Sequence, residues 1–199
     1  MMKWQKVDVV KLCEPAFDGV GKVIRKEIIR QDTGRSYSAL TTAMAYALDR
    51  EVLYKTRVLP ALKNGAFVLQ DRGLPASLAY QTAQAKVNGE KLSMEDILSF
   101  PGNRLALENA PGILIIPDVD VSTAMKRIEE RDKKDNSIFE NPRFQKSVRA
   151  VYFSKKFEKI FSNAGTKIVF VDTGISHNYT KNESINAIRE YLRGKKLFC

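Results

Sequence analysis

The segment from Ala66 to Gln81 constrains the fold more than any other part of this sequence. Its first four residues, Ala66 to Leu69, are all apolar and follow an Asn-Gly turn signal, which predicts a strand that is buried on both faces. An acid and a base, Asp71 and Arg72, come shortly after these residues. Because parallel α/β sheets bind ligands at the carboxyl ends of their strands, we expect these two side chains to lie at a ligand site.

A helix is expected to follow this strand. Gly73 permits a tight turn, and the helix opens at Leu74. Ser77, Tyr80 and Gln81 can line one flank of that helix, because residues three and four apart share a helical face.

Strand-like and helix-like segments alternate along the rest of the chain. The other strand-like runs are residues 7–12, 113–116 and 167–171, and helical patterns cover 20–29, 37–63, 122–131, 144–161 and 185–192. This alternation predicts a three-layer α/β fold with a mostly parallel sheet. At 199 residues, with no linker or low-complexity segment, the chain is expected to form a single domain over residues 1–199.

The composition narrows the class of protein. A formal net charge of +10 favours a partner that carries phosphate, although no block of like charges stands out and a solvated basic surface is the simpler alternative. No apolar run reaches about 18 residues and the N-terminus shows no signal-peptide pattern, so we expect no membrane association. Two cysteines, Cys13 and Cys199, give no disulfide framework, which fits a cytoplasmic location.

A second candidate site lies on the long helix predicted over residues 37–63. Tyr46 and Arg50 are four residues apart and therefore share a face. An aromatic ring and a guanidinium on that face can sandwich a nucleobase and donate a hydrogen bond to its carbonyl oxygen. The alternative is a surface tyrosine beside an ordinary Asp-Arg pair.

These segments resemble motifs of the thymidylate kinase family. The segment from Asp71 to Gln81 is similar to Asp-Arg-Tyr-x-x-Ser-Ser-x-Ala-Tyr-Gln, with Gly73 in place of the aromatic residue and Ala76 in place of the first serine. Tyr46 to Arg50 is similar to the family's Leu-Phe-x-Ala-Asp-Arg.

Two further segments extend the resemblance from about residue 7 to residue 195. Glu14-Pro15, with Ile24-Arg25 following, is similar to Glu-Pro-Gly-Gly-x-x-x-Gly-x-x-Ile-Arg, although Ala16-Phe17 replaces the glycine pair. Asp118-Val-Asp120 is similar to the family's Leu-Asp-Val-Asp-Pro-Glu segment, which leads into the family's lid, here about residues 131–142.

The resemblance implies a P-loop NTPase-like fold and a nucleoside monophosphate kinase that passes the γ-phosphate of ATP to dTMP with Mg²⁺. Arg72 would bind the acceptor phosphate, while Asp71 would orient Mg²⁺ or its waters. Arg131, or failing that Arg127, would be the lid arginine that reaches the transferring phosphoryl group. A homodimer is expected from the resemblance alone.

The resemblance also assigns the base-binding residues. Tyr46 and Arg50 would hold the thymine, and Ser77, Tyr80 and Gln81 would read its edge and the sugar.

One element of such a kinase has no counterpart in this sequence. P-loop kinases cradle phosphates with G-x-x-x-x-G-K-[ST], and the nearest segment here has Gly21-Lys22 but Ala16 at the first glycine and Val23 at the hydroxyl position. The family's first strand, P-loop and first helix precede its Glu-Pro segment, which here begins at Glu14. A truncated reading frame, a partner chain that supplies the strand, and a diverged protein with rearranged neighbours all stay open.

Two other functions are compatible with the sequence. The first is a catalytically inactive nucleotide-binding remnant or subunit, which the missing P-loop favours. The second, weaker one is a nucleic-acid-binding protein, which the net charge allows but no interleaving of aromatic and basic residues supports. A zinc site is not expected, because His177 is the only histidine and the two cysteines lie far apart in the sequence.

Overall fold

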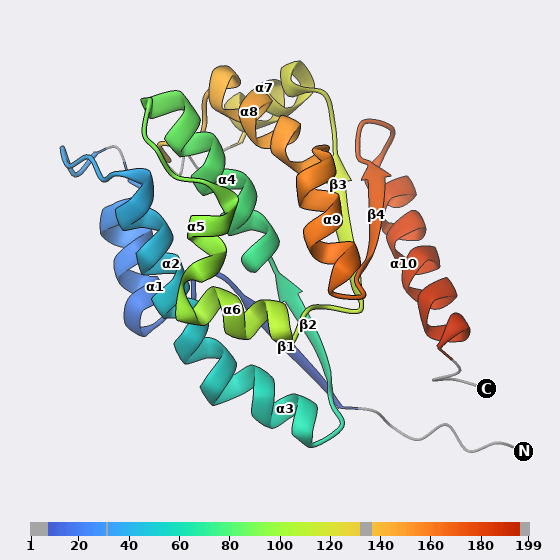
Figure 1. The fold of residues 1–199 in the computed structure, drawn as a ribbon. Helices are drawn as coiled ribbons and strands as arrows, with labels where there is room; N and C mark the ends of the chain where they lie inside the picture. Colours follow the sequence, from blue (N-terminus) through green and yellow to red (C-terminus); the bar gives the residue numbers. More distant parts are fainter. Residues whose placement is uncertain (1–7, 31, 132–136, 196–199) are drawn as a thin grey trace, which may run out of the picture. The chain divides into compact units, whose positions relative to one another are not determined.

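The computed structural model describes residues 8–30, 32–131 and 137–195 (Figure 1). Within these ranges the strands form two parallel pairs. Strand β1 (Val9–Cys13) pairs with β2 (Phe67–Asp71), and β3 (Ile113–Asp118) pairs with β4 (Lys167–Asp172). The predicted α/β class with parallel strands is confirmed.

The chain divides into two compact units. The first contains Met1–Glu108 and Asn136–Phe139, and the second contains Asn109–Asp135 and Glu140–Cys199. Each unit therefore has one of the strand pairs and its own helices. The expected single domain stays a prediction.

The first unit carries the long helical segment that was predicted over residues 37–63. It runs through α2 (Ala39–Leu53), the π-helical η2 (Tyr54–Val58) and α3 (Leu59–Lys63). Ser38 caps its start by accepting a hydrogen bond from the backbone N–H of Thr41. The π-helical stretch lies just ahead of Pro60, which has no N–H to donate and whose ring would clash with the carbonyl four residues before it.

The other helices of the first unit are short, apart from α4, which starts from the end of β2. They are α1 (Gly19–Val23), the π-helical η1 (Ile24–Ile28), α4 (Leu74–Asn88), α5 (Met94–Ser99) and α6 (Pro101–Glu108). Helix α6 was not predicted, because it is only eight residues long and begins with the Pro-Gly pair of residues 101 and 102, which resembles a turn signal.

Besides β3 and β4, the second unit contains α7 (Val121–Glu129), α8 (Pro142–Tyr152), α9 (Lys155–Asn163) and α10 (His177–Gly194). The prediction of one helix over residues 144–161 is wrong. The first helix ends at Tyr152, and Ser154 caps the second by accepting a hydrogen bond from the N–H of Phe157. None of the helices described in either unit is long and apolar enough to cross a membrane.

The prediction that β2 is buried on both faces is also wrong. Leu69 is 50% exposed, and its register partner Lys11 on β1 is exposed as well. The apolar run suggested an interior strand of a wide sheet, whereas the sheet of this unit has two strands in the part of the chain that is described. Leu69 and Lys11 therefore lie on an exposed face of the pair.

Gly102 allows α6 to pack directly on α2. A Cβ atom at this position would lie 1.9 Å from the carbonyl oxygen of Ala47 and 2.9 Å from the backbone nitrogen of Glu51. We expect Gly102→Ala to lower the free energy of unfolding by about 1–3 kcal/mol in urea titrations, because the two helices must move apart. The control Gly194→Ala places its methyl group in open space and should change stability by less than about 0.5 kcal/mol. Equal stability of the two variants would contradict the close packing.

Candidate functional site

A pocket of about 240 Å³, measured with its open mouth, lies in the first unit near the carboxyl ends of β1 and β2. It is lined by residues that follow these strands and by one face each of α2 and α4. The lining residues are Glu14, Tyr46, Arg72, Gly73, Ala76, Ser77, Tyr80 and Gln81. Five side chains that the sequence singled out in two separate segments therefore share one pocket.

Helix α4 supplies most of this lining because of where it starts. Gly73 is its N-cap residue and Pro75 lies in its first turn, a position where the missing N–H of proline has no cost. Ser77, Tyr80 and Gln81 then follow at helical spacing on the pocket side.

The inner wall of the pocket carries a buried polar side chain, Gln81, that has an unpaired hydrogen-bond acceptor. Its side chain is almost fully buried, and its Oε1 has no hydrogen-bond partner among the described residues. Leaving a buried acceptor unpaired costs about 1–3 kcal/mol. A ligand that donates a hydrogen bond to this oxygen would remove that cost.

Arg72 has an unusual backbone conformation. Its φ is +70°, in the left-handed region that side-chain-bearing residues rarely occupy. Such strain, of order 1–3 kcal/mol, is concentrated at ligand-binding and catalytic positions. The exposed guanidinium lies over the ring of Tyr80, with 5.6 Å between its central carbon and the ring centroid.

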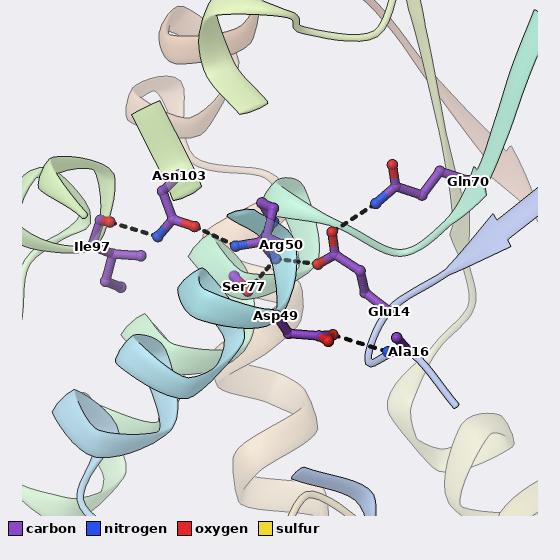
Figure 2. A network of polar contacts seen from close by, with 8 residues as sticks. All are labelled: Glu14, Ala16, Asp49, Arg50, Gln70, Ser77, Ile97 and Asn103. Atoms are coloured by element: carbon purple, nitrogen blue, oxygen red, sulfur yellow. Dashed lines mark hydrogen bonds and ion pairs between the residues drawn. The ribbon is translucent and has the colours of Figure 1, made fainter. Parts of the chain in front are cut away.

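Arg50 lies behind the pocket wall, whereas Tyr46 lines the pocket. The Arg50 side chain is fully buried and forms an ion pair with Glu14 (Figure 2). It also donates hydrogen bonds to Ser77 Oγ, at 2.8 Å, and to Asn103 Oδ1. Its Nε is buried without a partner among the described atoms. The expected contact of Arg50 with a base stays a prediction. In the structure its hydrogen-bond and ion-pair partners are Glu14, Ser77 and Asn103.

Three residues of this network were missed in the sequence. Asn103 on α6 donates to the carbonyl oxygen of Ile97 at 2.6 Å, and Gln70 on β2 donates to Glu14 Oε1 at 2.8 Å. Asp49 accepts a hydrogen bond from the N–H of Ala16 at 2.9 Å and so fixes the loop after β1 (Figure 2). No local pattern could have revealed their links to the site, because these connect Asn103 to Arg50, Gln70 to Glu14 and Asp49 to Ala16, which lie 53, 56 and 33 positions away.

Burial dominates the electrostatics of the site. It raises the pKa of the Glu14 carboxyl, while the Arg50 guanidinium and its hydrogen bond act in the opposite direction. Burial also raises the pKa of Tyr46 to about 12, so its hydroxyl stays protonated at neutral pH.

The remaining predicted residues lie outside the pocket lining. Asp71 is exposed at the end of β2. Arg131, in the second unit, forms an ion pair with Glu140 at 2.6 Å, and Arg127 donates to the carbonyl oxygen of Thr173 at 2.8 Å. Of the expected lid over residues 131–142, positions 132–136 lie outside the described residues.

Comparison with solved structures shows the fold. The fold matches thymidylate kinase from Candida albicans with a TM-score of 0.62 at 16% identity, covering 94% of this chain and 80% of that one. Thymidylate kinase from Ehrlichia chaffeensis matches with the same TM-score at 19% identity, covering 92% and 81%. The chain thus has the P-loop NTPase-like α/β kinase fold.

Sequence comparison gives the family. The family model for thymidylate kinase matches residues 2–182. Thymidylate kinase from Anoxybacillus flavithermus is 33% identical over 177 residues, which are 84% of this chain and 81% of the relative. That from Ruthia magnifica is 31% identical over 158 residues, or 78% and 73%. The chain belongs to the thymidylate kinase family, as its motifs indicated.

Proposed function

We propose that this protein is a thymidylate kinase, which transfers the γ-phosphoryl group of ATP to dTMP and forms dTDP. The observation that carries the proposal is the single pocket shared by Tyr46 and the residues from Arg72 to Gln81. It combines an aromatic wall, a buried amide with an unpaired acceptor and an exposed guanidinium. These groups suit a base, its imide N–H and a phosphate, respectively.

In this proposal dTMP lies along the start of α4. The ring of Tyr46 packs against thymine, and Gln81 Oε1 accepts the hydrogen bond of the base N–H. Ser77, which lines the pocket and accepts a hydrogen bond from Arg50, faces the base edge and connects it to that arginine behind the wall. Tyr80 contacts the sugar, and Arg72 binds the phosphate.

The phosphoryl donor is proposed to be ATP with Mg²⁺. The described residues contain no cluster of three or more metal-ligating side chains. Mg²⁺ in kinases nevertheless needs only one or two carboxylates in addition to phosphate oxygens, and the exposed Asp71 beside Arg72 fits that requirement. When bound, the ion would neutralise charge on the phosphates. Arg131 would serve as the lid arginine by exchanging Glu140 for a phosphate oxygen.

An inactive nucleotide-binding remnant is not favoured, because the family match spans residues 2–182 and the chain has the kinase fold. What raised this alternative is that the printed sequence lacks G-x-x-x-x-G-K-[ST]. The two readings differ in turnover, since only a kinase forms dTDP.

The proposal is tested by calorimetric titration with dTMP and, separately, with Mg-ATP, followed by an assay for dTDP formation. We expect binding of both nucleotides and Mg²⁺-dependent turnover. Binding of dTMP without ATP binding or turnover would select the remnant. No response to either nucleotide would contradict both readings.

A cytoplasmic location is part of the proposal. Its support is the match to the thymidylate kinase family model over residues 2–182.

We also propose a homodimer that forms through α2. Leu40, Met44, Leu48 and Val52 recur every four residues along this helix and are each 46–54% exposed. A continuous apolar stripe of this kind is unusual on a monomer, and the same stripe on a second copy can cover it around a two-fold axis.

Leu48→Glu is expected to dissociate this dimer, because it places a charge in the middle of the stripe. Light scattering and sedimentation should then report the mass of one chain instead of two. Ile175→Glu is the matched control, since Ile175 is another exposed apolar residue, in the second unit, and its replacement should leave the dimer intact. A wild-type protein that is monomeric at micromolar concentration would contradict the proposal.

A further inference from the structure

Gly73 occupies the position at which the family pattern has an aromatic residue. Its backbone angles, φ +119° and ψ −155°, fall in a region that essentially only glycine occupies. Arg72, immediately before it, also has a positive φ. Two successive residues with positive φ therefore turn the chain from β2 into α4, and an aromatic residue at position 73 could not adopt this turn.

The space that a side chain at position 73 would need is occupied by Gln70. A Cβ atom on Gly73 would lie 2.9 Å from Gln70 Nε2 and 3.5 Å from its Cδ. The same Nε2 donates to Glu14 Oε1 at 2.8 Å, and the other oxygen of Glu14 pairs with Arg50 (Figure 2). Gln70 thus connects the turn to the buried ion pair at the ends of both strands.

We propose that Gly73 and Gln70 are positioning residues for Arg72, and that together they replace the aromatic residue of the family pattern. The inference rests on the proposed function, in which Arg72 binds the phosphate of dTMP. Gly73 permits the turn that presents Arg72 to the pocket. The Gln70 amide packs against Gly73 and donates a hydrogen bond to Glu14, which restrains the turn.

A methyl group at position 73 has two effects at this place. It strains a conformation that only glycine tolerates, and it displaces the Gln70 amide from Glu14. Both effects shift Arg72, whereas Tyr46 and Gln81, which are proposed to bind the base, lie on helical segments away from the turn. Binding of the phosphate should therefore be lost while binding of the nucleoside is kept.

The test compares the affinities of dTMP and thymidine for the wild-type protein and for each variant by calorimetry. Gly73→Ala is expected to reduce the ratio of dTMP to thymidine affinity by about 10-fold or more, because small displacements of a positioning group have large effects. Thymidine affinity itself should change by less than about 2-fold. Gln70→Ala adds no backbone strain and should reduce the ratio by about 3-fold, so the inference stays testable if Gly73→Ala folds poorly.

Two controls separate positioning from general damage. Gly89→Ala strains a second positive-φ glycine at the other end of α4, where no atom lies within 4 Å, and should leave the ratio unchanged. In an Arg72→Ala background, Gly73→Ala should have no further effect on the ratio, because the two changes act through the same guanidinium.

Equal losses of dTMP and thymidine affinity in Gly73→Ala and Gln70→Ala would overturn the inference, since they indicate a purely structural role. A wild-type preference for dTMP that survives both substitutions would also overturn it, while the proposed function would stand. A wild-type protein that binds thymidine as tightly as dTMP would refute the phosphate-binding role of Arg72, and the inference would fail with it.

Discussion

Replacing Glu14 with leucine is expected to lower the free energy of unfolding by about 3–5 kcal/mol, the usual cost of breaking a buried ion pair. Glu14 and Arg50 are 2% and 0% exposed, so neither charge has access to water. Removing the carboxylate leaves the guanidinium buried with only the neutral Ser77 and Asn103 as partners. Urea denaturation with matched m-values measures the loss.

The double variant Glu14→Leu/Arg50→Met is the control for this prediction. Replacing both partners removes the uncompensated charge, so most of the stability should return. Glu14→Gln keeps one hydrogen-bond acceptor without the charge, so its free energy of unfolding should lie between those of the wild type and Glu14→Leu. A Glu14→Leu protein within about 1 kcal/mol of the wild type would show that the ion pair is not buried as described.

Replacing Arg72 with alanine is expected to reduce kcat/KM for dTMP by about 100- to 1,000-fold, which is typical for the loss of one charged group that contacts a reacting phosphate. Stability should not fall, because the side chain is exposed and its backbone is strained at φ +70°. Arg72→Gly should be equally impaired in dTMP turnover and should unfold at no lower urea concentration, since glycine adopts this φ without strain.

Arg57→Ala provides the matched control, because Arg57 is another exposed arginine of the first unit that does not line the pocket. Its kinetics should match those of the wild type. Unchanged kcat/KM in Arg72→Ala would remove Arg72 from the site, and an equal loss in Arg57→Ala would indicate a nonspecific charge effect.

Local sequence patterns were sufficient for the strands and for most of the pocket. Four short apolar runs predicted the four described strands, and helical spacing brought Ser77, Tyr80 and Gln81 to one flank. The Asp-Arg pair at the end of β2 marked where the pocket opens. These features depend on neighbours within one or two turns, which a sequence shows directly.

Features that depend on tertiary partners could not be predicted. The burial of Arg50 follows from Glu14 and Asn103, which lie 36 and 53 positions away in the sequence. The exposure of Leu69 depends on what packs against its face of the sheet, which its own apolar run does not encode. In the sequence Gln70 has the pattern of an ordinary strand residue, because its role depends on the contacts of its amide with Gly73 and Glu14.

The central claim is that dTMP binds in the pocket between Tyr46 and Arg72, and the position of dTMP in a crystal structure of the complex tests it most directly. We predict electron density for thymine against the ring of Tyr46, within hydrogen-bonding distance of Gln81 Oε1, with the phosphate on the Arg72 guanidinium. A dTMP molecule bound at any other place on the protein, with this pocket empty, would contradict the account.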